Sequence, residues 1–164
     1  MNENVFDDDQ RDETPFERAD RNWNEILQEA RVIQTCTQII GGFLLALAFQ
    51  SRFGELDAYQ LTLYLVLVAL AGVATTLGLA LVIMHRRFFG KRQKLRVVRI
   101  GNRLLICNLA VVSVLAALVT SLIFDFVLSH AAGVVALIVG LALAVVLWVI
   151  VPGLGKREES ESGS

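Results

Sequence analysis

Four stretches of this chain are apolar enough to cross a membrane. Three of them, at 61–84, 104–124 and 131–151, have the length of about 20 residues that a membrane-spanning helix needs. The remaining stretch, at 32–49, is the first along the chain; it is shorter and is interrupted by Gln34, Thr35, Thr37 and Gln38. Because a backbone in lipid must satisfy its own hydrogen bonds, we predict helices rather than strands. The predicted fold is all-α, a bundle of four transmembrane helices.

Local signals place the ends of these helices. Thr14 to Glu17 (TPFE) is a capping box with proline at the first helical position, so the first helix is expected to begin there. Asp57 to Gln60 (DAYQ) is a second cap before the second span, and Pro152-Gly153 predicts the end of the fourth. We therefore predict a membrane domain at 14–151, between an acidic disordered head at 1–13 and a disordered tail at 152–164.

The first helix is expected to begin well before its membrane span. In this earlier part, apolar residues alternate in three- and four-residue steps, as on one face of a helix. They are Phe16, Ala19, Trp23, Ile26, Ala30 and Ile33. The pattern predicts an amphipathic cytoplasmic extension of the first helix.

The positions of lysine and arginine predict the orientation. The segment between spans two and three is strongly basic, and both termini add further lysines and arginines, whereas the opposite side carries only Arg52. Cytoplasmic loops retain such residues. We therefore expect an inner-membrane protein with both termini in the cytoplasm.

Composition supports the membrane assignment. Hydrophobic residues make up 55% of the chain and charged residues 19%, against about 45–50% and about 25% in soluble domains. The net charge of −1 and the two separate cysteines argue against a nucleic-acid-binding domain and a disulfide scaffold. No nucleophile elbow, P-loop, HExxH or dinucleotide motif occurs, so we expect no enzymatic activity, cofactor or metal.

Polar residues inside the first span are the main candidate site. Arg31, Gln34 and Gln38 recur at three- and four-residue steps and so share one face of the helix. Such a face is expected to meet protein or water rather than lipid. Two interpretations stay open: the amides hydrogen-bond to neighbouring helices, or they line a polar permeation or ligand pathway.

Three acidic residues form a second set of candidates. Glu25 and Glu29 lie one helical turn apart, where they hold a cation or belong to a solvated, salt-bridged face with Arg21 and Arg31. Asp125 falls at the outer end of the third span. There it either stays hydrated at the interface or couples a proton or cation.

A basic stripe and small-residue ridges suggest partners. The stripe contains Arg92, Arg96, Arg99 and Arg103. It is a candidate contact for anionic lipid headgroups, although topology alone also explains its charge. Small residues recur every four positions in span four, at Ala136, Gly140 and Ala144. Such ridges bring helices together, within the chain, in a homo-oligomer or with another membrane protein.

The segment from Arg21 to Val151 resembles a family of small, uncharacterised actinobacterial membrane proteins classed as a domain of unknown function. The matching features are NEILQE at 24–29 with Arg31-Val32, Gln34-Thr35, Gln38, Arg52-Phe53 and His85-Arg86. The resemblance implies four transmembrane helices and no established activity, substrate or cofactor. Our leading expectation is a non-enzymatic interaction or accessory subunit. The alternative is a small oligomeric transporter or channel for an ion or small solute.

Overall fold

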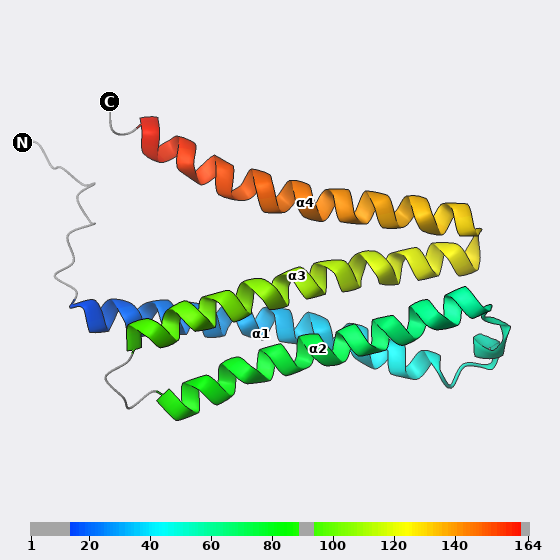
Figure 1. Ribbon diagram of the computed structural model, residues 1–164, viewed down its shortest axis with the longest axis horizontal. Coiled ribbons are helices and arrows are strands. Elements are labelled where there is room, and N and C mark those ends of the chain that lie inside the picture. Colours follow the sequence, from blue (N-terminus) through cyan, green and yellow to red (C-terminus); the bar gives the residue numbers. More distant parts are fainter. Residues whose placement is uncertain (1–13, 89–93, 162–164) are drawn as a thin grey trace, which may run out of the picture.

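The computed structural model describes residues 14–88 and 94–161, and these residues form an all-α fold without strands (Figure 1). The four long helices are α1 (Pro15–Leu47), α2 (Ala58–Phe88), α3 (Lys94–Val127) and α4 (His130–Glu161), and a short 3-10 helix, η1 (Ser51–Glu55), lies between α1 and α2. Each long helix contains a segment long and apolar enough to cross a bilayer. The predicted fold is confirmed: the chain has the architecture of a multi-pass membrane protein.

Both predicted caps are present. In the first, the backbone N–H of Thr14 donates to Glu17 Oε2 over 2.8 Å, and Glu17 N–H donates back to Thr14 Oγ1 over 3.4 Å. In the second, Gln60 N–H donates to Asp57 Oδ1 over 2.8 Å, and Asp57 N–H donates to the Gln60 side chain over 3.1 Å. Each pair satisfies backbone donors that the first helical turn leaves free.

Helices α1, α2 and α3 pack against one another and enclose the core. The core is divided into two clusters along the bundle. One contains Trp23, Ile26, Ala30, Ile33, Leu81 and Leu105. The other contains Leu44, Tyr64, Leu67, Ala71, Leu115 and Leu122. The periodic apolar residues of early α1 from Ala19 to Ile33 are thus buried, while the position of this part of α1 relative to the membrane stays a prediction.

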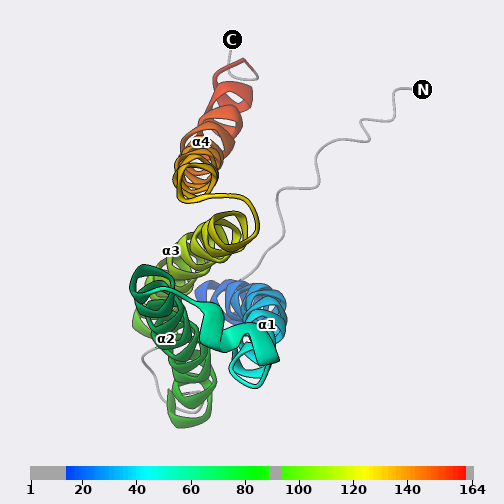
Figure 2. The same cartoon turned by 90° about the vertical axis from the view of Figure 1, so that its right-hand side faces the viewer.

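Helix α4 lies outside this three-helix group and packs against α3 (Figures 1 and 2). Only 6% of the residues in its most apolar 18-residue segment are buried inside the chain, against 22–28% in the corresponding segments of the other three helices. In a bilayer the residues of this segment that do not face α3 therefore meet lipid or another protein.

The end of the fourth helix differs from the prediction. Pro152 and Gly153 were expected to end it, but α4 continues through both residues to Glu161. A proline removes one backbone donor, and a helix can continue with that single loss. Residues 1–13, the predicted acidic head, lie outside the described residues.

Candidate functional site

Asp125 joins three helices at the end of the bundle where α2 begins and α3 ends. Its Oδ1 accepts a 2.7 Å hydrogen bond from Nε2 of Gln60 on α2. Its Oδ2 lies 2.7 Å from Nδ1 of His130, the first residue of α4. The carboxylate thus has a partner on each side, and His130, with a 65% exposed side chain, covers it from outside.

The expectation that Asp125 stays hydrated at the membrane surface is wrong, because only 6% of the residue is exposed. The connection between α3 and α4 is short, so α4 begins directly over the end of α3. Gly133 permits this approach, since a Cβ at that position would lie 2.6 Å from Cβ of Asp125. Ser121 adds a 2.9 Å hydrogen bond to the carbonyl of Gly133.

One partner of this buried carboxylate is thus the exposed imidazole of His130. Its other partner, Gln60, is an amide that does not titrate. No group of three metal-ligating side chains occurs among the described residues. Sequence reasoning singled out Asp125 but missed Gln60, which is 65 positions away in the chain.

The candidate residues of the first span lie together in a groove between α1 and α2. Arg31, Gln34 and Gln38 line this groove, which has a volume of about 410 Å³. Arg31 and Gln38 are exposed on the surface of the bundle, and Gln34 is half-buried. The groove therefore opens sideways, toward the surroundings of the bundle, and we call it the α1–α2 polar groove.

Asn108 on α3 is a polar residue that sequence reasoning missed. It is only 1% exposed, and neither side-chain atom has a hydrogen-bond partner among the described residues. Its amide and that of Gln34 both approach Gly78 of α2, where a Cβ would meet each of them. The available signal was an asparagine within the apolar run 104–124.

The remaining predicted charged residues do not converge on a site. Glu25 and Glu29 are both exposed on α1, and Arg99 and Arg103 are exposed on α3. Arg92 lies outside the described residues, as does the side chain of Arg96. The lipid contact predicted for this basic stripe stays a prediction.

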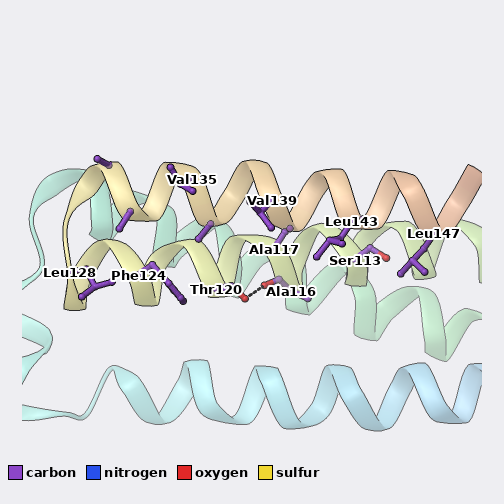
Figure 3. Close-up of a pocket in the computed structure, with 15 residues that line it drawn as sticks. Ser113, Ala116, Ala117, Thr120, Phe124, Leu128, Val135, Val139, Leu143 and Leu147 are labelled. Atoms are coloured by element: carbon purple, nitrogen blue, oxygen red, sulfur yellow. Dashed lines mark hydrogen bonds between the residues drawn. The ribbon is translucent and has the colours of Figure 1, made fainter.

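A second, larger groove of about 820 Å³ runs between α3 and α4 (Figure 3). Small residues from both helices form much of its lining, and we call it the α3–α4 groove. From α3 they are Ser113, Ala116, Ala117 and Thr120; from α4 they are Ala131, Ala132, Ala136, Gly140 and Ala144. The predicted ridge of span four therefore faces α3, where a Cβ on Gly140 would lie 3.0 Å from that of Ala117.

Comparison with known proteins identifies the family. Residues 12–152, which include all four apolar segments, match a family of unknown function, DUF6328. The chain belongs to DUF6328. No curated protein and no solved structure matches this DUF6328 protein. The resemblance to a family of unknown function is thereby confirmed, while the actinobacterial origin stays a prediction.

Proposed function

We propose that this DUF6328 protein is a non-enzymatic interaction or accessory subunit that binds a transmembrane helix of another polypeptide in the α3–α4 groove. The observation that supports this proposal is the lining of the groove. Its lining is mostly small or apolar, and Phe124, Val135 and Leu143 lie along its margins (Figure 3). A groove of this kind suits close helix packing.

The physics of helix association in lipid supports this role. Lipid tails are as apolar as leucine, so helices associate by van der Waals packing, and small residues allow their backbones to approach closely. Helix α4 packs against α3 and has few fully buried residues in its apolar segment. A partner helix in the α3–α4 groove would contact both α3 and α4 and stabilise their pairing.

The proposal places the protein in the cell's inner membrane with both termini in the cytoplasm. The distribution of lysine and arginine supports this orientation. The orientation is tested with a variant in which Ser replaces Cys36 and Cys107. A single cysteine is then introduced at Gly54, where a side chain has open space. A membrane-impermeant thiol reagent should label Gly54→Cys in intact cells, whereas labelling only after lysis would contradict this orientation.

The interaction role is tested by filling the groove. Ala116→Leu adds bulk to the lining, and Ala110→Leu adds the same bulk at an exposed α3 position that does not line the groove. The mass of the complex purified in mild detergent is the measurement. We expect the wild type and Ala110→Leu to exceed the monomer mass of 18.1 kDa, and Ala116→Leu to lose the added mass.

The composition of the complex identifies the partner. A mass that is a multiple of the monomer means a second copy, and any other mass means a different chain. A wild-type monomer that carries ions across liposome membranes would overturn the interaction role.

The alternative function is a small oligomeric transporter or channel. It is favoured by the α1–α2 polar groove, which reaches Gln34 and Gln38, and by the unpaired amide of Asn108. Because Gln38 is exposed on the outside of the bundle, a polar route would need further copies to enclose it. Ion flux in liposomes that falls in Gln38→Leu but not in Ile39→Leu, an exposed neighbour, would support transport.

A further inference from the structure

The α1–α2 polar groove has a basic end and no acidic residue in its lining. Arg31 supplies the positive charge, and Gln34 and Gln38 supply amide groups. None of these three side chains has a hydrogen-bond or ion-pair partner within 14–88 and 94–161. The hydroxyl of Thr35, in contrast, already donates to the carbonyl of Arg31 over 3.0 Å. The groove thus presents one cation and two free amides.

A mostly apolar groove of about 340 Å³ adjoins this one along α1 and α2. The two grooves share Gln38. Gly41, Gly42 and Gly72 form an open part of the second groove, and Leu45 and Val68 line it further along. Its hydroxyls of Thr37 and Thr75 both donate to backbone carbonyls within their own helices. The two adjoining grooves are together called the furrow, which is polar at the Arg31 end and apolar beyond Gln38.

The furrow has the length of one leaflet. Arg31 and Leu45 are 14 positions apart on a continuous helix, which corresponds to about 21 Å. A bilayer is about 40–45 Å thick with its headgroups, so one leaflet is about half of that. On α2, the lining residue Val82 lies one turn before the exposed Arg86. The polar end of the furrow therefore lies at the end of the bundle that carries the basic segment between spans two and three, which we call the basic end.

We propose that this furrow binds one anionic phospholipid from the leaflet at the basic end of the bundle. The phosphate would lie against the guanidinium of Arg31, the most suitable side chain in the lining for an anionic phosphate. The amides of Gln34 and Gln38 would hydrogen-bond to the ester region, and one acyl chain would follow the apolar part past Gly41 and Gly72. Charge complementarity and the polar-to-apolar order both favour a phospholipid over an apolar protein helix, which would bring no group to neutralise Arg31.

Lipid titration with native mass spectrometry of the full chain tests the site. The two probes are phosphatidylglycerol and phosphatidylcholine with identical acyl chains. We expect tighter binding of phosphatidylglycerol, and about fivefold weaker binding in Arg31→Gln, as for loss of one basic contact to an anionic lipid. Arg31→Lys should keep most of the affinity. Gly72→Leu, which fills an open part of the furrow, should weaken binding of the acyl chain.

Two control variants separate this site from general attraction to basic residues. Arg18→Gln removes an exposed charge from α1 outside the furrow, and Arg87→Gln removes one from α2 outside the furrow. Both should bind phosphatidylglycerol as the wild type does, and circular dichroism should show equal helicity in all variants. The proposal is overturned if the wild type binds both lipids equally, or if either control loses as much affinity as Arg31→Gln. Because the readout is lipid binding, its result is independent of the partner in the α3–α4 groove.

Discussion

The side-chain amide of Gln60 donates a 2.7 Å hydrogen bond to the carboxylate of Asp125, and this bond ties the start of α2 to the end of α3. The same amide accepts a bond from the backbone N–H of Asp57 through its oxygen. Gln60 therefore caps its own helix and positions a buried acid on another one. His130 on α4 completes the set at 2.7 Å from the second carboxylate oxygen.

The first prediction concerns Asp125→Asn. The substitution removes the carboxylate charge and turns one accepting oxygen into an NH₂ donor. The hydrogen bond from Gln60 then has a neutral acceptor, and His130 can pair with the NH₂ group only through an accepting Nδ1. Hydrogen bonds to a charged group are worth about 1.5–3 kcal/mol. We expect a loss of that size in the free energy of unfolding in detergent micelles. The control is Glu55→Gln, which breaks an exposed pair with Arg52 and should cost at most about 1 kcal/mol. Equal losses in the two variants would contradict the buried role of Asp125.

The second prediction concerns Gly101→Ala. A Cβ at this position of α3 would lie 2.5 Å from Cζ3 of Trp23, a buried and rigid ring on α1. Overpacking of this kind costs about 1–3 kcal/mol. Gly72→Ala is the matched control, because a Cβ there meets nothing within 4 Å, and alanine is the better helix former. Thermal unfolding should show Gly101→Ala less stable than the wild type, and Gly72→Ala no less stable.

The third prediction concerns Gly133→Ala at the start of α4. The added Cβ would lie 2.6 Å from Cβ of Asp125 and 3.0 Å from the backbone oxygen of Ser121. A backbone atom cannot move aside as a flexible side chain can, so α4 must shift away from α3. We expect destabilisation by about 1–3 kcal/mol and faster proteolysis near the α3–α4 connection. Unchanged proteolysis would mean that α4 tolerates the displacement.

The fourth prediction concerns Asn108→Leu. In the structure the amide of Asn108 is buried and unbonded, so an apolar residue of similar size should remove a desolvation cost of about 1–3 kcal/mol. We expect a higher midpoint of thermal unfolding. The control is Asn102→Leu, an exposed position on the same helix, which should leave the midpoint nearly unchanged. A lower midpoint in Asn108→Leu would show that the amide is satisfied by a bound water or by Gln34.

Several features of the fold and site depend on residues close together in the chain, and these were predictable. The capping boxes at Thr14 and Asp57 each need a partner only three positions away, and membrane spans depend on the average hydropathy of one segment. The shared face of Arg31, Gln34 and Gln38 also follows from helical periodicity alone. The actual α1–α2 polar groove, however, needs Gly78 and Leu79 from the second helix.

The sequence by itself determined the four helices, the starts of the first two and the polar face of the first span, because each depends on the local period and hydrogen-bonding of one helix. Only the tertiary structure decided that Asp125 is buried beneath His130, that Asn108 approaches Gly78, and that α4 lies outside the three-helix core. Each of these depends on contacts between helices. In lipid such contacts come from close packing and a few hydrogen bonds, which depend on the rotation and depth of each helix and leave no pattern in a single segment.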